Sequence, residues 1–215
     1  MPEVKERPIL FSAPMVRALL NGQKTVTRRM MKIQPVLEGG FWKVYGAGWG
    51  ERTSSVPAIS GHSLSTNCPY GRPGDRLWVR ESLGYDSEYG HYFAAGGKHG
   101  ETVYLCSLFD NEEAQTGYSY DGLLPERSVP SIHLHRRYSR ILLEVVAVRV
   151  ERLQDITEEQ AKAEGVLSCE RDIDEDGNGY SPLELFGGLW TMINGMESWH
   201  ANPWVWVVEF KRVTP

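Results

Sequence analysis

The stretch from Ile141 to Val150 constrains the fold most, because Val, Leu and Ile dominate it. A strand this apolar does not face water on one side, so we place it at the centre of a sheet. Residues 76–81 and 204–211 are predicted as two more strands. Few of the strands are joined by helices at regular spacing, which argues against a doubly wound parallel sheet. We predict an α+β fold, a small and mostly antiparallel β-barrel or curled sheet with short helices at its ends.

Length and charge limit the class of protein further. A chain of 215 residues that is 41% hydrophobic can bury one substantial core. We expect a single domain over residues 1–215, with loop insertions at about 34–67 and 84–130 and a further strand over 101–108. The formal net charge of −5 argues against a general nucleic-acid coat protein, which needs a wide basic face.

The sequence predicts no disulfide framework, metal site or membrane span. Cys68, Cys106 and Cys169 are widely spaced, with no CxxC pair among them. The segment 172–183 begins like a calcium loop, but Leu183 stands where a bidentate glutamate belongs, so we expect a solvated acidic turn. The chain starts without the apolar core of a signal peptide, and no apolar run is long enough to cross a bilayer. We therefore expect a cytoplasmic protein with no membrane partner.

Three short helices are specified by residues at their ends. The first follows Ser12, which can cap it, and ends at Asn21-Gly22. The second has a capping box and ends at Gly165, and the third has a capping box and ends at Asn194-Gly195. The capping residues are Thr157 and Gln160 in the second helix and Ser181 and Glu184 in the third. The apolar stripe of the third helix, which we interpret as core, consists of Phe186, Leu189, Trp190 and Ile193.

Glu164 is unusual because it lies in the last turn of the second helix. A carboxylate there faces the negative end of the helix dipole and loses roughly 0.3–1 kcal/mol. Either a cation compensates for it, or it is an exposed residue that tolerates the penalty.

Two stretches are rich in hydrogen-bond donors. Lys24 to Arg29 offers an amine, a hydroxyl and two guanidinium groups just after the first helix, which suits an anionic or carbonyl-bearing ligand. His133 to Arg140 is the most basic stretch of the chain and could hold a base edge or a carboxylate. The alternative for both stretches is a solvated basic surface.

The combination of motifs resembles the ASCH domain family, which belongs to the PUA-like β-barrels. The resemblance rests on Gly22-x-Lys24-x-x-Thr27-x-Arg29, on Gly74-Asp75 before a strand, on Ile156-Thr157-Glu158-Glu159 running to Glu164, and on the closing strand. The chain is similar to long members of the family that bacteriophages and prophages encode. The resemblance implies the PUA-like β-barrel and, in one branch of the family, an amidohydrolase that removes the acetyl group from N4-acetylcytidine.

The same resemblance implies the catalytic residues. In the amidohydrolase branch, a catalytic lysine and threonine three residues apart match Lys24 and Thr27, and a catalytic glutamate at the end of a helix matches Glu164. Thr27 is then the candidate nucleophile and Lys24 its base, with Glu164 orienting Lys24 or acting as general acid. The alternative is Glu164 as base for a water molecule, with protonated Lys24 and Thr27 polarising the carbonyl. On a regular strand Lys24 and Thr27 would point to opposite faces, so we predict a turn or bulge between them.

We expect a nucleoside substrate, with RNA as a further candidate partner, and no cofactor. Aromatic faces and hydrogen-bonding side chains would recognise the base. The candidate substrate-binding residues are Arg28, Arg29, Trp78, Arg80, Glu81, His133, Arg136 and Tyr138. Glu81 is either a strand-end residue that reaches water, which we favour, or a buried carboxylate with a partner. Two alternative functions are a non-catalytic module that binds RNA or a modified base, and a ribonuclease that uses the same pocket.

Overall fold

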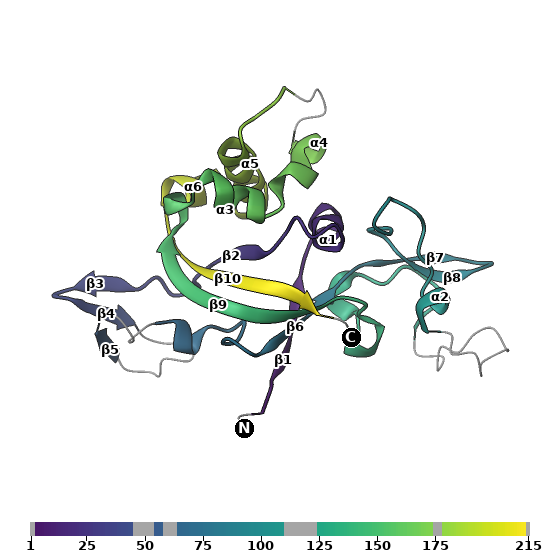
Figure 1. Ribbon diagram of the computed structural model, residues 1–215, viewed down its shortest axis with the longest axis horizontal. Helices are drawn as coiled ribbons and strands as arrows, with labels where there is room; N and C mark the ends of the chain where they lie inside the picture. The colour runs from purple at the N-terminus through teal and green to yellow at the C-terminus, as the bar shows by residue number, and fades with distance from the viewer. Residues whose placement is uncertain (1–2, 45–53, 58–63, 110–123, 174–177, 214–215) are drawn as a thin grey trace.

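A five-stranded sheet forms the centre of the computed structural model, which describes residues 3–44, 54–57, 64–109, 124–173 and 178–213 (Figure 1). The strand order is β1-β6-β9-β10-β2. The bounds are Glu6–Leu10 for β1, Val26–Met30 for β2, Arg76–Arg80 for β6, Leu142–Arg152 for β9 and Trp204–Val213 for β10. The apolar stretch after Ile141 is thus β9, and its predicted central position is confirmed.

The sheet is mostly antiparallel, as predicted, but it is not a closed barrel. Among its described strands only β1 and β6 pair in parallel, and β1 and β2 are the two edges of the sheet. The long strands β9 and β10 curve strongly, and their pairing shifts register between Glu209 and Phe210 (Figure 1). The curvature brings the edges together at one point, where Arg29 Nη2 donates a hydrogen bond to the carbonyl oxygen of Leu10 at 2.5 Å.

Helices cover one face of the sheet, above β9, β10 and β2 in Figure 1. These helices are α3 (Glu158–Ala163), α4 (Glu170–Ile173), α5 (Pro182–Asn194) and α6 (Met196–His200), with the 3₁₀ segments η4 (Leu153–Asp155) and η5 (Val166–Cys169) between them. Val26, Val205 and Val207 of the sheet are buried against this layer. A second core lies on the opposite face, where α1 (Ala13–Leu20) and the 3₁₀ segment η1 (Leu64–Asn67) pack into the curve of the sheet.

The helix ends follow the sequence signals in most respects. Both predicted capping boxes are present, at Thr157 and Gln160 and at Ser181 and Glu184. Ser12 occupies the N-cap of α1, but its side chain makes no capping hydrogen bond, so its predicted capping role is wrong.

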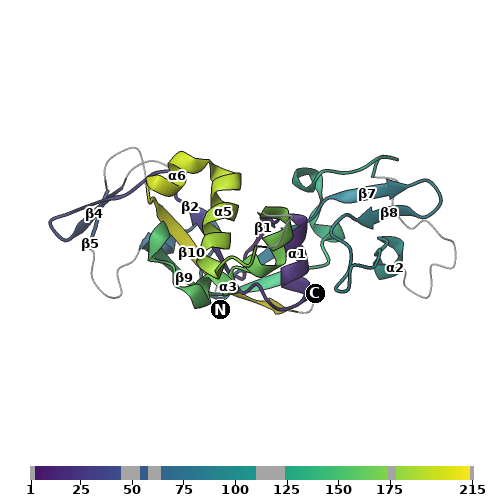
Figure 2. The same cartoon turned by 90° about the horizontal axis from the view of Figure 1, so that it is seen from above.

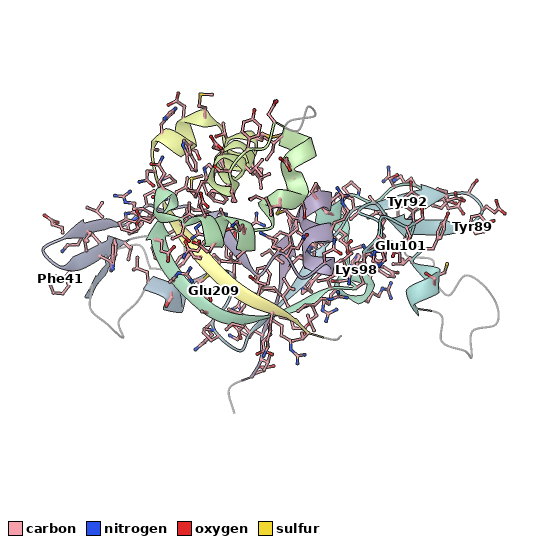
Figure 3. All side chains as sticks on the ribbon, turned by 45° about the horizontal axis from the view of Figure 1, so that its top comes forward. Phe41, Tyr89, Tyr92, Lys98, Glu101 and Glu209 are labelled. Carbon is pink, nitrogen blue, oxygen red and sulfur yellow. The ribbon has the colours of Figure 1, made fainter. Side chains whose placement is uncertain are left out.

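The two predicted loop insertions contain ordered strands that extend from opposite ends of the sheet (Figure 2). One is the antiparallel sheet of β3 (Val36–Glu38), β4 (Phe41–Val44) and β5 (Ser54–Pro57), with Phe41 near its tip (Figure 3). The other is the hairpin of β7 (Leu83–Asp86) and β8 (Gly90–Phe93), with Tyr89 near its tip (Figure 3).

The strand predicted over 101–108 is wrong. Tyr104 makes one isolated bridge to Tyr92, and the chain then forms α2 (Cys106–Phe109). The 3₁₀ segments η2 (Ser131–His133) and η3 (Arg136–Tyr138) follow before β9. Among the helices that the structure describes, none has the length and apolar character needed to span a bilayer.

Candidate active site

Lys24 lies where the chain passes from α1 to β2, and it pairs with the end of α3 instead of with β10. Gly22 ends α1 with a φ of 72°, and Lys24 then forms an isolated antiparallel bridge with Glu164. The regular pairing of β2 with β10 begins only at Val26. This irregularity, which we predicted, lets Lys24 and Thr27 border the same cavity.

Gly165 permits the close approach of α3 to Lys24. Its φ of 80° lies in the left-handed region, where a glycine has no steric penalty. A Cβ atom at this position would lie 2.7 Å from Cβ of Ala18 and 3.1 Å from Cβ of Lys24. A larger residue would therefore push the end of α3 away from the lysine.

The ammonium group of Lys24 has three oxygen acceptors around it. Nζ is 2.9 Å from the carbonyl oxygen of Val26, 2.8 Å from that of Glu164 and 2.9 Å from Oε2 of Glu164. A neutral amine has two protons to donate and an ammonium has three, so this arrangement is that of a Lys24 ammonium and a Glu164 carboxylate. The cation predicted to compensate Glu164 is therefore present.

The ion pair lies in a buried environment, since Lys24 is 4% exposed and Glu164 is 5% exposed. Burial lowers the pKa of Lys24 from its ordinary value, and the attraction of Glu164 opposes this effect only in part. The nearby Arg29 guanidinium lowers the pKa of Lys24 further. The site thus holds a lysine whose neutral form is more accessible than that of a lysine in water.

Arg28 holds the second oxygen of the Glu164 carboxylate. Its Nη1 lies 3.4 Å from Oε1 of Glu164, and its Nη2 donates to Gln160 at 2.7 Å and to Glu151 at 3.2 Å. Because its buried guanidinium is turned toward these three side chains, we assign Arg28 to the support of Glu164. Arg28 also borders the cavity described next, and its predicted role in direct substrate binding stays a prediction.

Lys24, Thr27, Arg29 and Glu164 border one cavity of about 120 Å³. Thr27 is 3% exposed, so its hydroxyl reaches the cavity from a buried position on β2. Arg29 enters from the same strand, with its guanidinium carbon 5.3 Å from the centre of the Phe11 ring. Arg28 borders the cavity as well, so the structure brings the three predicted catalytic residues together with two predicted substrate-binding residues.

The apolar wall of the cavity was not predicted from the sequence. It comes from the end of β1, from α1, from the end of β2 and from α5, and its members include Leu10, Phe11, Met15, Met30, Phe186, Leu189, Trp190 and Ile193. The stripe of α5 is core at Phe186 and Trp190, but Ile193 is 64% exposed. Its helical spacing indicates burial and does not distinguish a core from a cavity wall, so no local pattern signals this role.

Six predicted substrate-binding residues do not border this cavity, which corrects the prediction. Trp78 and Arg80 lie on the face of β6 opposite to the core residues Leu77 and Val79. The guanidinium of Arg80 stacks 4.8 Å from the Trp78 ring and donates to the carbonyl oxygen of Ile132. These two side chains therefore hold the segment after residue 130 against the sheet.

Of the other four residues, three contact other parts of the protein and the fourth is exposed on the segment after residue 130. Glu81 is 1% exposed and accepts two hydrogen bonds from Arg140, so it is the buried carboxylate with a partner that we did not favour. Tyr138 is buried in the core below the β7–β8 hairpin. Arg136 pairs with Glu6 at 2.6 Å, and His133 is exposed on η2.

No cluster of three or more His, Cys, Asp or Glu side chains in the described part of the chain is placed to hold a metal ion. Residues 174–177 of the calcium-like segment lie outside the described residues. Comparisons of this chain with protein-family models, with curated proteins and with solved structures find no match.

Proposed function

We propose that the protein is an amidohydrolase that cleaves the N4-acyl amide of N4-acetylcytidine or a related N4-acylated cytosine nucleoside. The observation that carries the proposal is the meeting of Lys24, Thr27 and Glu164 in one buried cavity, although Glu164 lies 140 residues from Lys24 along the chain. An amine, a hydroxyl and a carboxylate are the groups that a metal-independent amide hydrolysis needs. The likeness of the motifs to the ASCH amidohydrolases supports the same reaction.

Lys24 and Glu164 would act as one proton-sharing pair. A proton that moves from Nζ to Oε2, which are 2.9 Å apart, converts the ion pair into a neutral amine and a carboxylic acid. Burial favours the neutral pair over separated charges, as the lowered pKa of Lys24 indicates. The amine can then accept the proton of the Thr27 hydroxyl as Oγ1 attacks the acyl carbon.

The remaining steps follow from the same groups. The attack forms a C–O bond and places negative charge on the carbonyl oxygen, which the nearby Arg29 cation stabilises. Collapse of this intermediate breaks the C–N bond, and the Lys24 ammonium protonates the departing N4 nitrogen. Water then attacks the acylated Thr27 with Lys24 as base, which releases the carboxylate and restores the hydroxyl.

The test is an assay of the purified protein with N4-acetylcytidine, followed through the loss of its long-wavelength absorbance. We expect turnover by the wild type and its loss, by a factor of about 100 or more, in Lys24→Met, Thr27→Val and Glu164→Gln. These substitutions keep the side-chain size, and circular dichroism checks the fold. Full activity in all three variants would refute the site, and the absence of turnover would leave a binding module or a ribonuclease.

A further inference from the structure

A second cavity, of about 410 Å³, lies beside the candidate active site where the chain leaves β2. Met31, Ile33 and Pro69 contribute apolar surface to it, and Tyr70 and Trp206 contribute aromatic rings. Lys32 and Asn67 border it with exposed polar side chains. The cavity is therefore part aromatic, part cationic and open to solvent at its polar residues.

Three observations connect this cavity to the active site. Met30 borders both cavities. Trp206 is the cross-strand partner of Arg29, so the two side chains lie on the same face of the sheet. The Arg29 guanidinium is also close enough to Tyr70 to oppose the rise in the pKa of Tyr70 that burial causes. Arg29 and Met30 thus form the boundary between two adjoining spaces.

The small size of the active-site cavity indicates which part of a substrate each of the two cavities would hold. Drug-sized ligands occupy cavities of about 300–1,000 Å³. A cavity of about 120 Å³ has room for an acyl group and the edge of one ring, but not for a whole nucleotide. The part of a substrate beyond the reacting base must therefore lie outside it, and the adjoining cavity offers space for that part.

The chemistry of the second cavity fits a neighbouring nucleotide. Proteins hold single-stranded nucleic acid by stacking bases on aromatic rings and by placing cations near the phosphates. Tyr70 and Trp206 supply aromatic surface, and Lys32 supplies one cation. One lysine suits a single phosphodiester and does not require the wide basic face that a net charge of −5 makes improbable.

We propose that this second cavity binds the nucleotide adjacent to the acylated cytidine, so that the preferred substrate is a single-stranded oligonucleotide and not the free nucleoside. This inference rests on the proposed function, because it takes the reacting base to be in the active-site cavity. Tyr70 would stack on the neighbouring base, and Lys32 would pair with the phosphate between the two nucleotides.

The test compares kcat/KM for N4-acetylcytidine with kcat/KM for an RNA trinucleotide that carries N4-acetylcytidine at its centre. We expect the wild type to prefer the trinucleotide. Tyr70→Leu should lower the ratio of kcat/KM for the trinucleotide to kcat/KM for the nucleoside roughly ten-fold, as the loss of one stacked base predicts. Lys32→Ala should lower the same ratio and weaken its dependence on salt. Matched controls are Tyr89→Leu and Lys98→Ala, because both side chains are exposed and neither borders either cavity.

Equal kcat/KM values for the two substrates, or equal ratios in wild type, Tyr70→Leu and Lys32→Ala, would overturn the proposal. If neither substrate is hydrolysed, fluorescence anisotropy with a labelled unmodified trinucleotide replaces the assay. Binding that both variants weaken and both controls keep would then support the second cavity while the proposed hydrolysis fails. Absence of binding, or binding that neither variant changes, would overturn it.

Discussion

The arrangement of Lys24, Glu164 and Arg28 places two cations on one buried carboxylate. A second carboxylate, Glu151, shares Arg28 and also pairs with Arg149, so the charges continue from the cavity toward the surface of the sheet. Such a network costs desolvation free energy and is poor evidence for stability by itself. Its consequence at the site is control over where the proton of the Lys24–Glu164 pair resides.

Replacement of Arg28 should change the pH dependence of hydrolysis. In Arg28→Met the carboxylate loses one of its two cations, so the pair takes up a second proton more easily. We expect the acid limb of the kcat/KM profile to move to higher pH by about one unit in Arg28→Met. Arg28→Lys keeps a cation beside Glu164, so its acid limb should move by less. The measurement is the pH profile with N4-acetylcytidine.

Arg149→Met provides the matched control, because Arg149 contacts Glu151 without contacting Glu164. Its acid limb should stay where the wild type has it. An unchanged profile in Arg28→Met, or the same shift in Arg149→Met, would contradict the positioning role of Arg28.

At the scale of elements, the short helix α3 fixes the carboxylate of the site. The Thr157–Gln160 capping box sets the start of α3, and Gly165 follows its end. Glu164, the C-cap residue just before Gly165, forms the bridge to Lys24. The sequence predicted these features because capping depends on residues only three or four positions apart. The meeting of Glu164 with Lys24 depends on a contact across 140 residues, and only the likeness to a known family indicated it.

Gly165→Ala should reduce both stability and turnover. A Cβ atom at a positive φ costs about 1 kcal/mol, and at this position it also collides with Ala18 and Lys24. Gly100→Ala is the matched control, since Gly100 has a φ of 84° and no atom within 4 Å of the added Cβ. We expect urea unfolding to show a loss of about 1 kcal/mol for Gly100→Ala and a clearly larger loss for Gly165→Ala. Only Gly165→Ala should lower kcat, and equal behaviour of the two variants would contradict the close packing of α3 on Lys24.

At the scale of the whole molecule, the curled sheet brings its two edges together at the active site. The sequence predicted β6, β9 and β10 from their apolar patterns, because burial imposes these patterns locally. Whether the sheet closes depends on the pairing of β1 with β2, which no local pattern encodes. The position of residues 131–138 on the outer face of β6 is likewise set by long-range contacts such as that of Arg80 with Ile132. Their basic composition therefore suggested a place beside the Lys24 cavity, which they do not border.

Asp75 holds the edge strand β1 to the rest of the sheet. Its carboxylate accepts hydrogen bonds from the Arg7 side chain at 2.7 Å and from the backbone amides of Lys5 and Arg72. Burial alone would raise the pKa of Asp75, but these hydrogen bonds outweigh it and lower the pKa below its ordinary value. The folded state thus binds its proton less readily than the unfolded chain does.

This difference predicts how acid affects stability. A carboxyl group with a lowered folded pKa stabilises the protein above its unfolded pKa, which is about 3.9, and loses this contribution as the pH falls through the folded value. We expect wild type to be more stable than Asp75→Asn at pH 7, with the difference shrinking as the pH falls below about 4. Urea unfolding across this range measures it, and a gap that does not change with pH would argue against an ionised Asp75.

Proton NMR of the reaction mixture tests the hydrolase most directly, because it detects the bond that is broken. With N4-acetylcytidine and wild-type protein, we predict that free acetate and cytidine appear in equal amounts, and that Thr27→Val forms neither at a comparable rate. Unchanged N4-acetylcytidine after prolonged incubation with folded wild-type protein, or equal acetate release by Thr27→Val, would contradict the account.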